Sequence, residues 1–178
     1  MRNVLVLGIE SSCDETACAV VLNGRRILSN VVASSLEDHR PYGGIIPEIA
    51  CRSHVASIGQ VLDEALKNAG VSYEDLHLIS ATSGPGLPGS LLVGLSFAKA
   101  LSFAKQIPFV GVDHLEAHLY ACLMRPSPPR FPLIGMVVSG GHTAIFRMSS
   151  LHTIERVAET QDDACGEAFD KVAKILGL

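Results

Sequence analysis

The segment GIESSCDETACAVV, residues 8–21, joins two apolar runs through a polar turn of serine and acidic residues. The run NVLVLGI at residues 3–9 is dense in aliphatic and β-branched side chains, which is typical of a buried strand. TACAVVLNG predicts a second strand, and the Asn23-Gly24 pair at its end predicts a tight hairpin into a third strand over 25–35. The sequence therefore predicts a fold that opens with three strands joined by turns.

Helices alternate with strands after this opening. Residues 47–70 begin with Pro47 and end with Gly70, which commonly start and stop a helix. The apolar face of this helix is expected to consist of Ile49, Val55, Ile58, Val61, Leu62 and Leu66. Strands are expected over 76–86 and 107–112, each followed by a helix. The pattern indicates an α/β fold.

A proline-rich segment, RPSPPRFP at 125–132, interrupts this alternation. After it the pattern starts again, with strands expected over 133–141, 142–150 and 152–160 and a helix over 162–178. We therefore predict a complete first lobe over 1–125, a linker over 126–131, and an incomplete second lobe over 132–178. One helix on a three-stranded sheet leaves the other sheet face bare, so the chain looks cut midway through a two-lobed fold.

Composition excludes several classes of protein. With 48% hydrophobic and 18% charged residues, the chain is expected to be globular and soluble rather than disordered. A net charge of −4 and the lack of a basic run argue against binding nucleic acid phosphates unaided. Five cysteines without a CxxC pattern indicate reduced thiols. We find no signal peptide and no membrane-spanning segment, so we expect a cytoplasmic protein.

Two hairpin turns are candidate binding elements. In VVSGGHTAIF, residues 137–146, Gly140 and Gly141 would let backbone N–H groups converge on an anion, and Ser139 adds a hydroxyl. In the first hairpin, Glu10 and Asp14 would repel a bare phosphate unless a metal ion, a lysine or a substrate donor intervenes. A purely structural turn is the alternative reading of both.

A glycine-rich loop, SGPGLPGSLLVG at 83–94, opens the next helix and could form an anion site at a helix N-terminus. It is not a P-loop, because no Gly-Lys-Ser/Thr follows. Close packing of strand on helix explains the small residues equally well.

His114 and His118 stand four residues apart on an expected helix, so both imidazoles point one way. Such a pair suits zinc or ferrous iron, and a structural role is the alternative. A metalloprotease would need glutamate directly after the first histidine, where this chain has Leu115, and Glu116 faces away. Asp113 points in the wrong direction, so the third ligand is expected beyond residue 178.

The remaining histidines and the last helix carry weaker signals. His39 and His54 flank a loop-then-helix segment, and His142 borders the glycine turn; His77 and His152 are interpreted as surface residues. In the last helix a polar face of Glu167, Asp170 and Lys171 opposes the apolar Ala168, Val172 and Ile175. A solvated helix face is the simple interpretation of those charges.

Six motifs occur in order: GIESSCDETACAVV (8–21), YGGIIPEIACRSH (42–54), SGPGLPGSLLVG (83–94), HLEAH (114–118), VVSGGHT (137–143) and DDACGEAFDKVAKILGL (162–178). With them the chain resembles the bacterial-type TsaD family of tRNA threonylcarbamoyladenosine transferases, formerly called O-sialoglycoprotein endopeptidases or glycoproteases. The resemblance covers essentially the whole chain. It implies RNase H-like lobes of the actin-like ATPase fold, shared with sugar kinases and heat-shock ATPases.

The resemblance also implies an activity and a site. These acyltransferases move a threonylcarbamoyl group from threonylcarbamoyl-adenylate, made from ATP, to the exocyclic amine of the adenosine next to the anticodon in tRNAs reading ANN codons. His114 and His118 would bind one divalent metal ion, iron or zinc. The acyl-adenylate site would be lined by Val137, Val138, Ser139, Gly140, Gly141 and Asp170. The family's third metal ligand, an aspartate, has no counterpart in this chain.

The expected partners are tRNA, a TsaB-like inactive paralogue and a small TsaE-like ATPase, with no membrane. We expect the 178-residue chain alone to be inactive in transfer. One alternative is a truncated, non-catalytic paralogue that serves as a dimerisation module. A sugar kinase is a further alternative, although nothing in the sequence suggests a sugar pocket.

Overall fold

The computed structural model describes residues 3–177 and divides the chain into two compact units, one ending at His114 and the other beginning at Leu115. Residues 1, 2 and 178, at the ends of the predicted lobes, lie outside the described residues. The internal contacts change after His114, so the proline-rich segment 126–131 lies within the second unit. The lobe boundaries given above stay a prediction.

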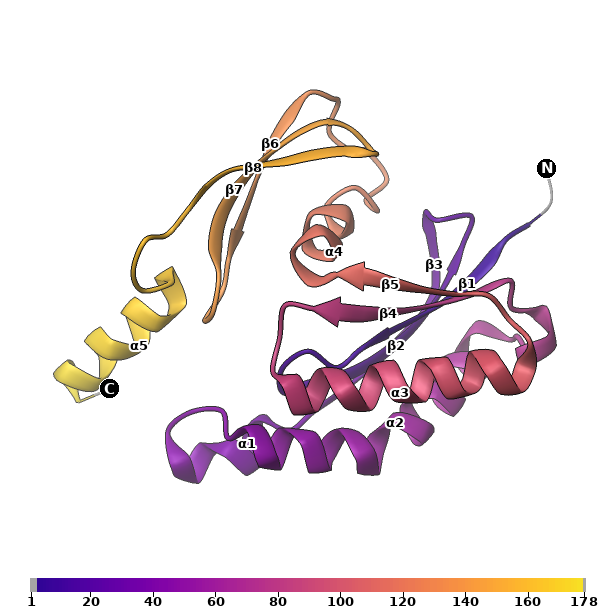
Figure 1. Cartoon of the computed structure of the whole chain (residues 1–178), viewed down its shortest axis with the longest axis horizontal. Coiled ribbons are helices and arrows are strands. Elements are labelled where there is room, and N and C mark those ends of the chain that lie inside the picture. Colours follow the sequence, from indigo (N-terminus) through magenta and orange to yellow (C-terminus); the bar gives the residue numbers. More distant parts are fainter. Residues whose placement is uncertain (1–2, 178) are drawn as a thin grey trace. The chain divides into compact units, whose positions relative to one another are not determined.

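The first unit is built on a five-stranded sheet (Figure 1). Its strands are β1 (Leu5–Glu10), β2 (Glu15–Leu22), β3 (Arg26–Ser34), β4 (Leu78–Gly84) and β5 (Phe109–Asp113). They are ordered β3-β2-β1-β4-β5, with β1, β2 and β3 antiparallel and β4 and β5 parallel to β1. This mixed order is that of an RNase H-like lobe, as the sequence predicts.

The hairpin between β2 and β3 forms where the Asn-Gly pair predicts it. Asn23 and Gly24 take positive φ angles of 54° and 66°, which these two residue types tolerate. The side-chain oxygen of Asn23 also accepts a hydrogen bond from the Val4 N–H at 2.8 Å. The turn therefore ties the hairpin to the chain just before β1.

Two long helices, α2 (Pro47–Ala69) and α3 (Pro88–Lys105), pack on the sheet and on each other. In Figure 1 both run along one face of the sheet. Pro47 starts α2, and Gly70, at φ 67°, ends it as predicted. Shorter helical turns are α1 (Leu36–His39), η1 (Arg40–Tyr42) and η2 (Tyr73–Asp75).

The core of the first unit lies between this sheet and α2. It includes Leu7, Val20 and Ile79 from the strands and Ile58, Leu62 and Ala65 from the helix, all at most 4% exposed. One prediction about the apolar face of α2 is wrong: Val55 is 65% exposed. His54 takes the inward position instead, because its ring finds hydrogen-bond partners in the interior.

The second unit holds an antiparallel sheet ordered β6-β7-β8. Its elements are β6 (Leu133–Val138), β7 (Thr143–Ser150), β8 (Thr153–Glu159) and α5 (Cys165–Leu176), together with all of α4 (His114–Ala121) except its first residue. A small core joins Leu115 and Leu119 of α4 to Val137, Phe146 and Met148 of the sheet. One face of the sheet is thereby covered.

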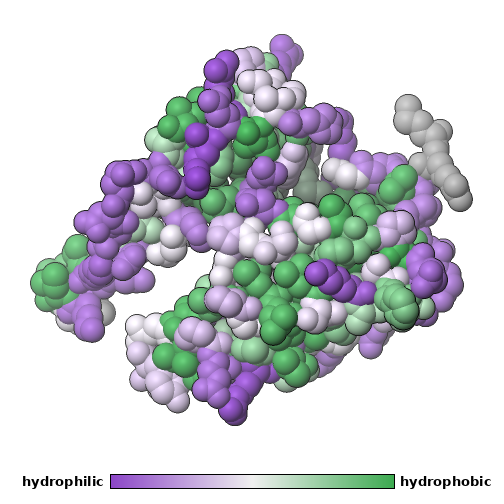
Figure 2. All heavy atoms as spheres, in the orientation of Figure 1, coloured by the Kyte–Doolittle hydropathy of each residue, from purple (hydrophilic) through white to green (hydrophobic). Residues whose placement is uncertain are grey.

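The helix that covers this sheet is not the one expected from the sequence. We expected α5, but none of its described residues is buried, and in Figure 1 it leads away from the strands. Its amphipathic pattern remains, with Phe169, Val172, Ile175 and Leu176 between 53% and 83% exposed. Ile134, Met136 and Val138 on β6 are also more than half exposed. Figure 2 shows hydrophobic residues reaching the surface in this part of the molecule.

Among the described residues, no helix is both long and apolar enough to cross a membrane.

Candidate functional site

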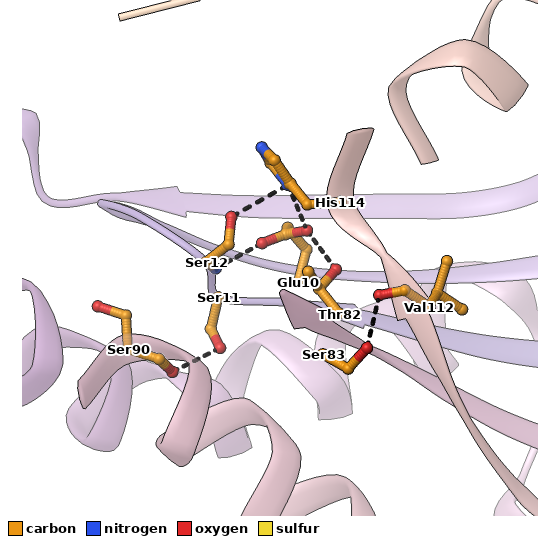
Figure 3. Close-up of polar contacts among 8 residues, drawn as sticks. All are labelled: Glu10, Ser11, Ser12, Thr82, Ser83, Ser90, Val112 and His114. Carbon is orange, nitrogen blue, oxygen red and sulfur yellow. Dashed lines mark hydrogen bonds and ion pairs between the residues drawn. The ribbon is translucent and has the colours of Figure 1, made fainter. Parts of the chain in front are cut away.

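The carboxyl ends of three neighbouring strands bring polar side chains together in the first unit. Strands β1, β4 and β5 are adjacent and parallel, so their ends meet at the same edge of the sheet. Glu10 is the last residue of β1, Thr82 lies near the end of β4, and His114 directly follows β5. Figure 3 shows these three side chains in contact.

Glu10 is the centre of this cluster. Its Oε1 accepts the Ser12 N–H at 2.5 Å, and its Oε2 accepts the hydroxyl of Thr82. The same Oε2 lies 3.4 Å from Nδ1 of His114, and Ser12 Oγ lies 3.2 Å from that ring nitrogen. These contacts come from three different strand ends, so the sheet itself sets their geometry (Figure 3).

The charge of Glu10 follows from these contacts. Burial raises its pKa, but the hydrogen bonds from His114, Ser12 and Thr82 outweigh burial and lower the pKa from 4.5 to about 2. The carboxylate is therefore ionised at neutral pH. The first hairpin turn presents a fixed negative charge beside an imidazole, which is unsuited to gripping a bare phosphate.

The turn after Glu10 is packed closely against the glycine-rich loop. Ser11 donates to the Ser90 carbonyl at 2.8 Å, and the Leu87 N–H donates to the Ser12 carbonyl at 2.8 Å. A Cβ on Gly86 would lie 2.6 Å from the Ser12 carbonyl oxygen, and one on Gly94 would lie 2.2 Å from Ser11 Oγ. Close packing therefore explains two of the loop glycines, and the anion site at the start of α3 stays a prediction.

Two buried histidines hold the same turn, and sequence reasoning missed this role for both. His54, fully buried on α2, lies with Nε2 3.0 Å from the Cys13 carbonyl and Nδ1 2.7 Å from Thr16 Oγ1. A carbonyl can only accept, so Nε2 is the donor and Nδ1 accepts from the Thr16 hydroxyl. The sequence does carry a signal for His54: it lies four residues before Ile58, so the two side chains share the buried face of α2.

His39 acts on the next carbonyl of the turn. Its Nδ1 accepts the Ile46 N–H at 3.1 Å, so Nε2 donates to Ser35 Oγ at 3.1 Å. The Ser35 hydroxyl then donates to the Asp14 carbonyl at 2.7 Å. Both direct partners of His39 lie within seven residues of it, and only the onward bond from Ser35 to Asp14 joins a distant segment, which no local pattern in the sequence reveals.

Cys13, although exposed, is not an activated nucleophile. Desolvation of its sulfur and the neighbouring Asp14 carboxylate raise its pKa to about 11. The thiol is therefore protonated at neutral pH.

Both histidines of the HLEAH motif belong to α4, as predicted. The side chain of His114 is 18% exposed, whereas His118 is exposed and lines a cavity of about 420 Å³ in the second unit, together with Leu119, Leu133 and Val137. Across residues 3–177 no group of three histidine, cysteine or acidic side chains is placed to hold a metal ion. Convergence of the two rings on one metal stays a prediction.

The donor chemistry of this helix nevertheless fits zinc or ferrous iron. Two imidazoles four residues apart are a common pair of ligands for these metals. Metal-binding histidines usually give their second ring N–H to a carboxylate, and Glu10 lies in that position beside His114.

The glycine turn of the second unit contacts the start of α5. The Gly166 N–H donates to the Ser139 carbonyl at 3.1 Å, and the Cys165 N–H donates to Thr143 Oγ1 at 2.8 Å. A Cβ on Gly166 would lie 2.7 Å from Gly140 Cα, so the two glycine-bearing segments touch through their backbones. The turn and the helix N-terminus therefore form one local element.

The six residues predicted to line the acyl-adenylate site do not all share one surface. Val137 is 6% exposed in the core, whereas Val138 is 51% exposed on the opposite sheet face. Gly140 and Gly141 are exposed, and a Cβ added at either would meet nothing within 4 Å. Asp170 is exposed in the second turn of α5 and makes none of the hydrogen bonds described for the glycine turn. Their role in binding stays a prediction.

Comparison with solved structures defines the class of this fold. YeaZ from Pseudomonas aeruginosa superposes with a TM-score of 0.56 at 15% identity, covering 88% of this chain and 66% of that one. A second Pseudomonas aeruginosa structure, described as similar to peptidase YEAZ, gives a TM-score of 0.58. At this identity the likeness shows the fold alone, which is an α/β fold shared with YeaZ.

Residues 26–178 match the family described as TsaD, tRNA N6-adenosine threonylcarbamoyltransferase, and the chain belongs to that family. A relative of that name in Protochlamydia amoebophila is 53% identical over 98% of this chain. Relatives in Caldicellulosiruptor bescii and Geobacillus kaustophilus are 55% and 54% identical over 98% and 99% of it. The chain spans about half the length of these proteins, 51% to 52%.

Proposed function

We propose that this chain supplies one part of a tRNA N-threonylcarbamoyltransferase. The reaction is transfer of the threonylcarbamoyl group from threonylcarbamoyl-adenylate to the exocyclic amine of the adenosine next to the anticodon, in tRNAs reading ANN codons. The observation that carries the proposal is 53% to 55% identity, over 98% of the chain, to proteins named for this activity.

In this proposal His114 and His118 hold one divalent metal ion, iron or zinc, with further ligands from outside the described residues. When bound, the ion would supply Lewis acidity and orientation at the acyl group. The imidazole pair on α4 and the carboxylate beside His114 support this role.

The turn at Ser139, Gly140 and Gly141 is proposed to contact the phosphate or carbamoyl group of the adenylate, joined by Val137, Val138 and Asp170. Open space around both glycines supports close approach of a ligand to the backbone. Because Gly141 has no neighbour to clash with, Gly141→Val should fold normally and still abolish transfer. Normal modification by that variant would make the turn structural only.

The partners belong to the same proposal. A net charge of −4 supports a need for a partner that offers tRNA a positive surface, which we propose to be a TsaB-like paralogue, with a TsaE-like ATPase. The proposed location is the cytoplasm.

A chimera tests the function. This chain is joined in register to the remaining half of the Geobacillus kaustophilus relative and supplied with threonylcarbamoyl-adenylate, unmodified tRNA and the partner proteins. We expect modified adenosine by mass spectrometry, loss of product in His114→Ala and His118→Ala, and normal product in the matched control His152→Ala. A folded chimera without product, or full activity in His118→Ala, contradicts the proposal.

The 178-residue chain assayed by itself is expected to give no product. Its described residues offer two imidazoles, too few to fix a metal ion, and rates depend on holding the reacting groups in a near-attack arrangement. Product at the rate of the chimera would show that expectation to be wrong.

A further inference from the structure

Glu10 lies where it can select the protonation pattern of the His114 ring. A neutral imidazole carries its proton on one nitrogen and a lone pair on the other. Nδ1 of His114 has two oxygen neighbours, Glu10 Oε2 at 3.4 Å and Ser12 Oγ at 3.2 Å. The serine hydroxyl could donate or accept, so it does not distinguish the two tautomers.

The carboxylate does distinguish them. An ionised carboxylate can only accept, so a lone pair on Nδ1 would face a negative oxygen, whereas a proton there is shared with Glu10 and Ser12. The Nδ1–H tautomer is therefore favoured, and it leaves the lone pair on Nε2. In Figure 3 the second ring nitrogen points away from Glu10.

Glu10 is itself held rigidly. The Ser12 N–H occupies Oε1 and the Thr82 hydroxyl occupies Oε2, so the carboxylate is fixed from β4 and from its own turn. His114 begins α4 directly after β5, and β5 pairs with β4. The geometry between carboxylate and imidazole is thus set by adjacent strands rather than by flexible loops.

We infer that Glu10 is a positioning residue, which fixes the Nδ1–H tautomer and the ring plane of His114 so that Nε2 is presented as the metal ligand. Binding of a metal ion by Nε2 rests on the proposed function, whereas selection of the tautomer by Glu10 does not. Outer carboxylates of this kind usually change metal affinity about 10- to 100-fold when they are removed.

The first measurement uses the chain without added metal. Long-range ¹H–¹⁵N correlation spectra of ¹⁵N-histidine-labelled protein report the tautomer of each ring, and the signal lost in His114→Gln assigns His114. We expect Nδ1–H in the wild type. In Glu10→Gln, whose amide can donate to Nδ1, we expect the Nε2–H form to appear, and the matched control Glu64→Gln, an exposed carboxyl on α2, should leave the ring unchanged.

The second measurement is Zn²⁺ affinity by calorimetry on the chimera described above, as wild type and with Glu10→Gln or Glu64→Gln, because the chimera restores the further ligands that the proposed function requires. Glu10→Gln should bind at least about tenfold more weakly than wild type and than Glu64→Gln. An Nε2–H tautomer in the wild type, or equal affinity in Glu10→Gln, overturns the inference, and the wild-type tautomer is read without relying on Glu10→Gln. If the tautomer is as expected but the wild type binds no Zn²⁺, the positioning by Glu10 stands and the proposed metal site falls.

Discussion

The two units hold the residues that the sequence analysis singled out on different foundations. In the first unit, Glu10, Thr82 and His114 stand on a five-stranded sheet whose core residues are almost fully buried by α2. In the second unit, the Ser139 turn stands on three strands and contacts a helix with no buried residue among those described. The difference indicates that the first unit holds the Glu10 cluster more rigidly than the second unit holds the Ser139 turn.

The amount of buried apolar area explains this difference between the two units. Burial of apolar surface is the main favourable contribution to stability, and the second unit leaves much of its apolar surface exposed on β6 and α5. Segments with few buried contacts open locally at low free-energy cost. The glycine turn should therefore become rigid only when further protein covers that surface.

The largest expected difference is in the free energy of unfolding when one leucine in each unit is replaced by alanine. Leu62→Ala removes a side chain that is 2% exposed in α2, and it should lower the free energy of unfolding by about 2–5 kcal/mol. Leu176→Ala removes the same atoms at 66% exposure in α5 and should change it by no more than about 0.5 kcal/mol. Urea unfolding measures both; similar losses would remove the contrast between the units.

The next effect concerns the buried histidine under the first hairpin turn. His54→Ala removes one of the two hydrogen bonds at the Cys13 carbonyl and one of the two at the Thr16 hydroxyl, which should together cost about 3 kcal/mol. His54→Gln should recover part of this loss, because its amide N–H reaches the position of Nε2, and His54→Asn should not. The exposed His152→Ala is the control. Equal losses for the glutamine and asparagine variants would show that the ring matters for packing only.

A smaller effect is expected at the contact between the glycine turn and α5. Gly166→Ala places a methyl group 2.7 Å from Gly140 Cα, so α5 must shift, at a cost of about 1–2 kcal/mol. Gly141→Ala meets nothing within 4 Å and serves as the control. The amide chemical shifts of Ser139 and Gly140 should change more in Gly166→Ala than in Gly141→Ala. Unchanged shifts in Gly166→Ala would mean that the turn and α5 are not in contact in solution.

The smallest effect is expected on the uncovered face of the second sheet. Met136→Thr replaces a side chain that is 59% exposed, so the free energy of unfolding should change by less than about 0.5 kcal/mol. Self-association in sedimentation experiments should decrease, because an exposed apolar patch is reduced. A large loss of stability would show that this face is buried in solution.

Much of the first unit could be predicted because local signals and tertiary packing agree there. Strand β1 is a continuous apolar run, Asn23 and Gly24 form the turn, and Pro47 and Gly70 bound α2. The exception is Val55: apolar periodicity predicts that its side chain is buried, but the side chain of His54 is buried instead. A histidine with both nitrogens hydrogen-bonded can replace a hydrophobic residue, which no hydropathy pattern reveals.

Less of the second unit and of the site could be predicted, because the deciding contacts join distant segments. The amphipathic pattern of α5 correctly predicts a helix, but not that its apolar face stays exposed. The spacing of His114 and His118 indicates a metal pair, yet it contains nothing about Glu10, which lies about a hundred residues earlier at the end of β1, with β4 between β1 and β5. Parallel strand pairing alone brings those two residues together.

Hydrogen exchange followed by mass spectrometry tests most directly whether the first unit holds the Glu10 cluster rigidly while the second unit holds the Ser139 turn loosely. Amides of β1, β4 and β5 should exchange orders of magnitude more slowly than those of β6, β7 and α5, because opening the first unit requires disrupting its buried core. Peptides that end at Glu10, Thr82 and His114 should be among the slow ones. Equal protection of the two sheets, or rapid exchange at the ends of β1 and β4, would contradict this difference in rigidity.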